Sequence, residues 1–370
     1  MPIPHVDPIP VPAPIWLMKV LLLLTLVLHF VAVQILIGSL VAVVWFSYRG
    51  RATGDAASKT VASVLARRIT VVMTFVINLG IPPLLFAQVL YGRALYTSSD
   101  LIGAIWISII FLLMACYAIL YRVQYRTVKG EPAALLALIA LLIAAGIGRI
   151  LTANMTLMLR PQVWYAMYAH SASGIYMPPH DPTALPRWGF MMTGGILTAG
   201  LWLLLHSGLS TIDDEAKNLL RRAGAIMASV GGVAQLAVGY AVYNTQPAFV
   251  QSGLADSPYY KIAGLAWAAC VVLTLLVGGA QIGLKKFNPV LTGVGWLTGF
   301  VSICGAVIVR DGIRDLTLRA KGFDVWARTE VSNWGVLSIF FVLFVVSLGV
   351  LGWLLLVMRQ ARQIQEQVAQ

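Results

Sequence analysis

Apolar runs of about 20 residues follow one another along almost the whole chain, and this pattern constrains the fold more than any other feature. A helix of that length crosses roughly 30 Å of hydrocarbon. Its backbone hydrogen bonds are all internal, as lipid requires. Hydrophobic residues make up 59% of the 370 residues and charged residues 11%, and a soluble chain cannot bury so much apolar surface. The sequence therefore predicts an all-α, polytopic transmembrane helix bundle.

About nine spans are predicted, at residues 16–46, 68–92, 101–122, 132–158, 188–207, 222–245, 260–282, 289–309 and 333–358. The resulting organisation is an N-terminal extended cap at 1–15, a four-helix half at 16–158, an outer loop at 159–187, a five-helix half at 188–358 and a cytoplasmic tail at 359–370. The long loop is rich in Pro, Tyr and Met. It suits a membrane-interface belt, a docking surface for an extracytoplasmic partner, or a lid over a quinone site.

The distribution of Lys and Arg predicts an N-out, C-in orientation. With the N-terminus outside, 15 Lys and Arg fall on predicted inner segments and five on outer ones, apart from residues 310–330. The net charge of +12 is then mostly a topogenic signal. No basic stripe with interleaved aromatic residues predicts a nucleic-acid partner.

Residues 310–330 form the most polar stretch of the chain. Their alternating charges predict a solvated or interfacial helix, with Leu316, Phe323 and Trp326 facing lipid. A surface ladder of salt bridges is one interpretation; a partner contact or a gate for a cofactor propionate is the other.

Carboxylates are predicted only in loops or at span ends. A proton-coupled transporter normally places an acidic residue in mid-membrane. Because none is predicted there, solute transport ranks third, behind the two hypotheses given below. The cysteines Cys116, Cys270 and Cys304 lie within spans and form no CxxC spacing. The sequence therefore predicts neither a disulfide framework nor a c-type haem.

His29 is the one histidine deep inside an apolar span, and an ionisable side chain there suggests a functional site. Arg149, in the fourth span, is predicted at a similar depth and needs an anion or a polar cavity. An imidazole on haem iron with an arginine on a propionate is one coherent interpretation, with Met191 as a candidate second ligand. The alternatives are a histidine bonded to a helix carbonyl and an arginine that snorkels outward.

The first span, with His29 in LTLVLHFVAVQILIGSLVAVV, resembles the first helix of subunit I of cytochrome bd quinol oxidases. The second span is similar in its Asn78-Leu79-Gly80 and Leu90-Tyr91-Gly92 spacing. The third span lacks the family's membrane glutamates, Met191 and its neighbour stand about where the family has a second haem histidine, and the Gly-Arg-Gln-Pro-Trp run is missing. These departures from the family count against oxygen reduction, and the resemblance implies a degenerate or repurposed relative.

The leading hypothesis from this resemblance is a multi-pass subunit of a respiratory complex in the bacterial inner membrane. It would exchange electrons with quinone or anchor redox subunits such as an extracytoplasmic cytochrome c or an iron–sulfur protein. His29 would bind one haem b, and the chain itself would be a non-catalytic subunit. The second hypothesis is a cofactor-free structural anchor derived from a bd-type subunit.

Overall fold

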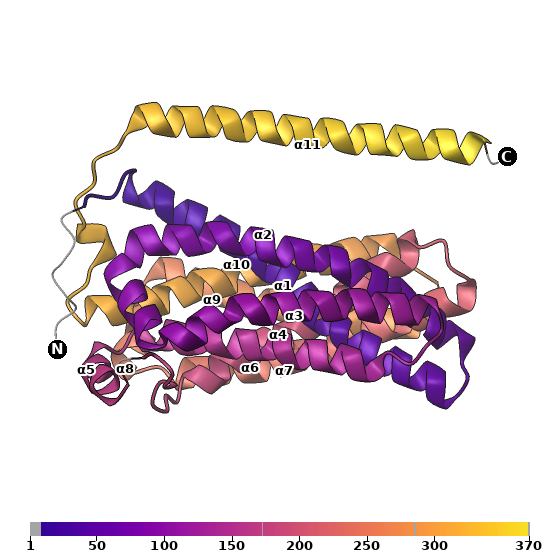
Figure 1. Cartoon of the computed structure of the whole chain (residues 1–370), viewed down its shortest axis with the longest axis horizontal. Helices are drawn as coiled ribbons and strands as arrows, with labels where there is room; N and C mark the ends of the chain where they lie inside the picture. Colours follow the sequence, from indigo (N-terminus) through magenta and orange to yellow (C-terminus); the bar gives the residue numbers. More distant parts are fainter. Residues whose placement is uncertain (1–8, 172, 285, 369–370) are drawn as a thin grey trace.

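The computed structural model describes residues 9–171, 173–284 and 286–368, which fold into a bundle of long helices (Figure 1). The helices are α1 (Ile15–Ala52), α2 (Ala56–Leu101), α3 (Gly103–Val128), α4 (Ala134–Leu157), α5 (Pro161–His170), α6 (Ala184–Leu209), α7 (Asp214–Asn244), α8 (Ala248–Asp256), α9 (Pro258–Gly283), α10 (Pro289–Arg319) and α11 (Trp334–Val368), with a 3-10 turn at Val325–Ala327. The prediction of an all-α bundle is confirmed. The short helices α5 and α8, which connect longer ones, were not predicted.

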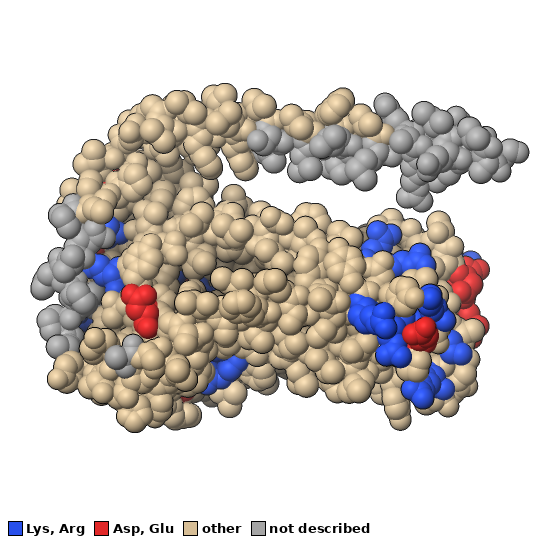
Figure 2. Space-filling model, viewed as in Figure 1, with Lys and Arg blue, Asp and Glu red and all other residues tan. Residues whose placement is uncertain are grey.

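Within the described residues, eight helices are long and apolar enough to cross a membrane: α1 to α4, α6, α7, α9 and α10. Figure 2 shows charged side chains gathered at the two ends of the bundle, with a broad uncharged belt between them. Both observations support a multi-pass membrane protein. The predicted ninth span falls on α11, whose described apolar stretch, Trp334–Val346, is shorter, so that span and the N-out orientation stay predictions.

Helix α1 occupies the centre of the bundle and packs against α2, α4, α6 and α10. Its side chains Leu22, Leu40 and Phe46 are fully buried. Helices α6 and α7 also pack closely. A Cβ added to Gly200 of α6 would lie only 2.7 Å from the carbonyl oxygen of Gly224 on α7. Glycine at these positions lets the two backbones approach, as is common where helices pack in membranes.

Helix α2 bends near its C-terminal end. Tyr91 has non-helical dihedral angles (φ −125°, ψ 20°), eight residues after Pro83. A kink of this kind leaves backbone carbonyls without helical partners. The Arg328 guanidinium donates to the carbonyls of Val89 and Leu90, the latter at 3.1 Å. The connection between α10 and α11 is therefore tied to the kink in α2.

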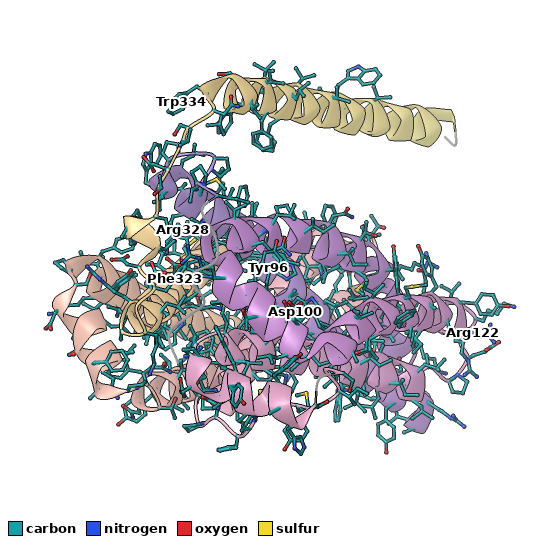
Figure 3. All side chains as sticks on the ribbon, turned by 60° about the vertical axis from the view of Figure 1, so that its left-hand side comes forward. Tyr96, Asp100, Arg122, Phe323, Arg328 and Trp334 are labelled. Atoms are coloured by element: carbon teal, nitrogen blue, oxygen red, sulfur yellow. The ribbon has the colours of Figure 1, made fainter. Side chains whose placement is uncertain are left out.

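Figure 3 places Arg328 and Phe323 at the end of the bundle that also holds Tyr96 and Asp100, with Arg122 at the opposite end. From there the chain passes through Trp334 into α11, which runs beside the bundle but separate from it (Figure 1). Most of the large apolar side chains of α11 that the structure describes are exposed, as for Ile339 at 62%, while Leu337 is partly buried against the bundle. This helix presents an apolar surface that the described chain does not cover.

The charged segment at 310–330 differs from its prediction. Residues 310–319 continue α10, and Asp311 and Arg314 are buried in the bundle. Phe323 is buried as well, whereas Trp326 is exposed. The prediction of a solvated helix was wrong because the charges find partners on α1 and α2, and a paired charge can be buried where a lone one cannot.

Candidate functional site

His29 lies on the face of α1 that packs against α2. A Cβ added to Gly80 would lie 2.9 Å from His29 Cε1 and 3.2 Å from Nδ1, so the imidazole occupies the space that the missing side chain leaves. The backbone of Val76 lies close to the same ring. His29 Nδ1 is buried and has no hydrogen-bond partner among the described residues. One nitrogen of this imidazole is thus free to accept a hydrogen bond or to bind a metal.

A cation lies near this histidine. The ring centroids of His29 and Phe30 are 6.0 Å apart, and the Arg310 guanidinium carbon is 5.8 Å from the Phe30 centroid. Arg310 comes from α10 and lies within electrostatic range of the imidazole. The sequence analysis had predicted Arg149, not Arg310, as the cation that accompanies His29. One sequence feature could have indicated Arg310: it follows directly after an apolar run of α10.

Arg149 lies on α4 and, with Leu112 of α3 and Leu142 of α4, lines a shallow groove of about 440 Å³. Its Nη1 is buried and has no hydrogen-bond partner in the part of the chain that the structure describes. No hydrogen bond, ion pair or ring contact joins it to His29 within the part of the chain that the structure describes. The pairing of these two residues on one cofactor therefore stays a prediction.

Met191 is half-buried on α6. It precedes Gly194 by three residues, and a Cβ on Gly194 would lie 2.7 Å from Gln34 Nε2 of α1. Residues three apart share a helix face, so Met191 lies on the side of α6 that faces α1. A thioether here can reach the interior between these helices, and its role as an iron ligand stays a prediction.

A buried ionic network joins α1, α2 and α10 at the end of the bundle where α1 begins. Lys19 Nζ lies 2.6 Å from Asp311 Oδ2 and also contacts Asp315. The Tyr91 hydroxyl donates to Asp315 at 2.6 Å. Arg314 pairs with Asp311, and its guanidinium carbon lies 3.9 Å from the centroid of the Tyr91 ring. Two cations and two carboxylates make this network electrically balanced.

Lys19 is one of the five Lys and Arg that the sequence assigns to outer segments, and the structure buries it to an exposure of 3%. The available signal was a lysine just inside the first apolar span, together with carboxylates at positions 311 and 315. Residues four apart project from one helix face. Such a pair can take a lysine ammonium between its two carboxylates.

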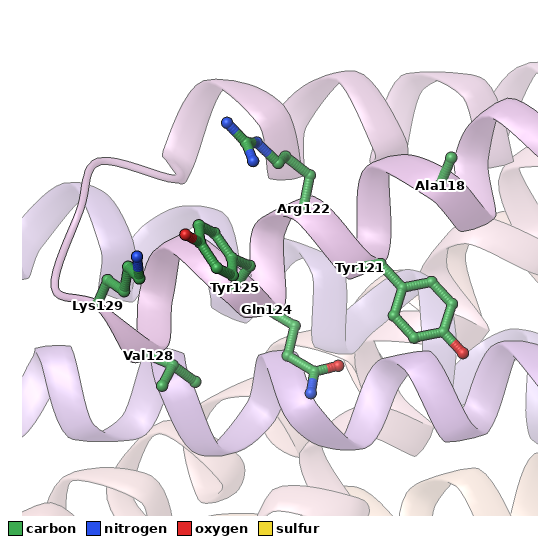
Figure 4. A pocket seen from close by; sticks show the side chains of 7 residues that line it. All are labelled: Ala118, Tyr121, Arg122, Gln124, Tyr125, Val128 and Lys129. Carbon is green, nitrogen blue, oxygen red and sulfur yellow. The ribbon is translucent and has the colours of Figure 1, made fainter.

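A second groove, of about 660 Å³, lies near the end of α3 (Figure 4). Arg122 and Lys129 flank the Tyr125 ring there, at 5.3 Å and 4.4 Å from its centroid. Lysine, arginine and tyrosine at the end of an apolar helix are typical of a membrane interface. This groove contains none of the predicted site residues.

The sequence matches no protein-family model and no curated protein. Among solved structures, a chain of the bd oxidase from Geobacillus thermodenitrificans superposes with a TM-score of 0.70, covering 91% of this chain and 96% of that chain at 13% sequence identity. This chain has a bd oxidase fold. The resemblance seen in the first two spans is confirmed at the level of the fold, and at this identity the likeness concerns the fold alone.

Proposed function

We propose that this chain is an integral membrane subunit of a respiratory electron-transfer complex, which exchanges electrons with a quinone or anchors the subunits that do. The observation that supports this most is the free Nδ1 of His29 on α1 of a bd oxidase-like bundle. The proposal places the chain in a bacterial inner membrane with its N-terminus outside. Its partners would be an extracytoplasmic cytochrome c or an iron–sulfur subunit.

One haem b is part of the proposal, with His29 as the ligand of its iron. The residues present fit such a group, because the imidazole has a nitrogen without a partner and Arg310 supplies a cation nearby. Met191 is the candidate second ligand. A bound haem would supply one-electron transfer, while the chain would orient the imidazole and exclude water.

The groove at Arg149 suits a quinone better than a haem propionate. Its other lining residues are apolar: Leu112, Ile139, Leu142, Ile143, Gly146 and Ile150. A quinone reaches a protein from the lipid and needs an apolar surface with few polar groups. The buried Arg149 Nη1 has an N–H to donate to a quinone oxygen.

A reduced-minus-oxidised absorption spectrum of the purified chain tests the haem. We expect a b-type band that is lost in His29→Ala and retained in His206→Ala. His206 is a matched control, because it is also buried but lies near the other end of the bundle beside Trp202. Absence of the band, or a band unchanged in His29→Ala, would remove haem from the proposal.

The second candidate is a cofactor-free anchor for redox subunits. It is favoured by the fit of the His29 ring against Gly80, since a histidine packed on a helix has a purely structural use. This candidate predicts a purified complex in which the chain holds no iron and His29→Ala leaves electron flux unchanged.

A further inference from the structure

The groove near the end of α3 holds two cations that no carboxylate balances. Arg122 and Lys129 contact the ring of Tyr125, and neither makes an ion pair within the described part of the chain. Glu131 is the one acidic residue between positions 101 and 180, and it is engaged at 3.2 Å by Arg126. The positive charge of the groove is therefore available to an anion from outside this chain.

The two cations lie around one aromatic ring. The Arg122 guanidinium carbon is 5.3 Å from the Tyr125 centroid and Lys129 Nζ is 4.4 Å from it, and both side chains point toward that ring (Figure 4). All three residues line the same groove of about 660 Å³. A guanidinium offers paired N–H donors and an ammonium offers a point charge, so the two groups can bind one phosphate together.

An exposed, mostly apolar face of α3 leads away from this groove. Its residues recur every three or four positions, which places them on one side of the helix: Ile110, Met114, Ala118, Tyr121 and Tyr125, all exposed. The helix rises about 16 Å from Met114 to Tyr125, and one leaflet contributes roughly 15 Å of hydrocarbon to a bilayer. This face is thus long enough for the acyl chain of a lipid whose headgroup lies in the groove.

We infer that this groove binds an anionic phospholipid, with its phosphate at Arg122 and Lys129 and an acyl chain along the exposed face of α3. Charge and depth favour a lipid as the occupant. The groove lies at the end of a membrane-spanning helix, where basic side chains meet the phosphates of anionic lipids, and tyrosine is common at the same level. The site contains neither His29 nor Arg149, so it stands apart from the proposed haem and quinone sites.

Native mass spectrometry of the purified full-length chain in a neutral detergent tests this inference. The chain is titrated with phosphatidylglycerol, with phosphatidylcholine of the same acyl chains, and with inorganic phosphate alone. The variants are Arg122→Gln, Lys129→Gln and the combination of both. The matched control is Arg126→Gln, which removes one positive charge from the same end of α3, but from a residue that pairs with Glu131 and does not line the groove.

We expect the wild type to bind phosphatidylglycerol more tightly than phosphatidylcholine. Each single variant should weaken phosphatidylglycerol binding about fivefold and the combined variant about 25-fold, because each basic side chain near an anionic lipid contributes a similar share of the binding free energy. Arg126→Gln should bind phosphatidylglycerol like the wild type. Inorganic phosphate should bind far more weakly than the lipid, because it has no acyl chain to contact α3.

Three results would overturn the inference. Equal binding of the two lipids, or an equal loss in Arg126→Gln, would show that the charge at this end of α3 acts diffusely and that the groove is not a site. Inorganic phosphate that binds as tightly as phosphatidylglycerol would make free phosphate the ligand. An acidic segment of a partner subunit seated on Arg122 and Lys129 in a density map of the native complex would show that the groove is a protein interface.

Discussion

Replacement of Lys19 by methionine should destabilise the fold strongly. The ammonium lies between the carboxylates of Asp311 and Asp315, and the lysine is 3% exposed. Methionine fills a similar volume but leaves the network with two carboxylates and the single cation of Arg314. Breaking a buried ion pair by removing one partner costs roughly 3–5 kcal/mol, so we expect a loss of that size in the free energy of unfolding. Denaturant unfolding of the purified chain, followed by tryptophan fluorescence, measures it.

Lys261→Met is the matched control, since Lys261 is exposed near the start of α9 and its loss should cost roughly 0–1 kcal/mol. Addition of Asp315→Asn to Lys19→Met restores the charge balance and should recover part of the stability. The two changes are therefore expected to be non-additive, as contacting residues are in double-mutant cycles. Equal costs for Lys19→Met and Lys261→Met, or strict additivity with Asp315→Asn, would refute the reasoning.

Gly80→Ala should destabilise the chain by roughly 1–3 kcal/mol, because the new Cβ would lie 2.9 Å from His29 Cε1. Gly279→Ala, where a Cβ meets nothing within 4 Å, should instead raise stability by up to about 1 kcal/mol in the same unfolding assay; a similar cost at both glycines would contradict the contact. The hydrogen bond from Ser58 to Asp55 lowers the pKa of that carboxyl below its ordinary value, so its contribution to folding is present above the unfolded pKa of about 4 and is lost as the pH falls through the lowered folded pKa. Unfolding temperatures measured from about pH 6 down to about pH 3 should fall less steeply in Ser58→Ala than in the wild type, and identical slopes would show that Asp55 is not the group responsible.

Sequence reasoning found the helices of this chain because each span carries its own signal, an apolar run whose length matches a bilayer. It failed at Lys19 and Asp311, because a charge near a span end is interpreted as solvated unless its partner is known. The two carboxylates that pair with Lys19 come from the other end of the chain, so each side of the pairing leaves a local signal but nothing local matches one to the other. The place of Arg310 beside Phe30 was missed for the same reason.

The pairing of His29 with Arg149 shows a related limit. Both residues were placed in the same half of the membrane from their distance to span ends, which fixes depth along a helix axis. Depth does not fix direction around the axis, however. His29 lies against Gly80 of α2, whereas Arg149 lines a groove with residues of α3; the sequence could not predict which helices the two residues contact.

A density map of the complex purified from its native membrane through a tag on this chain tests the account most directly. The proposed function predicts a flat macrocycle within ligand distance of His29. It also predicts neighbouring redox subunits in the same particle. A map in which His29 contacts only protein and no redox subunit accompanies the chain would contradict it.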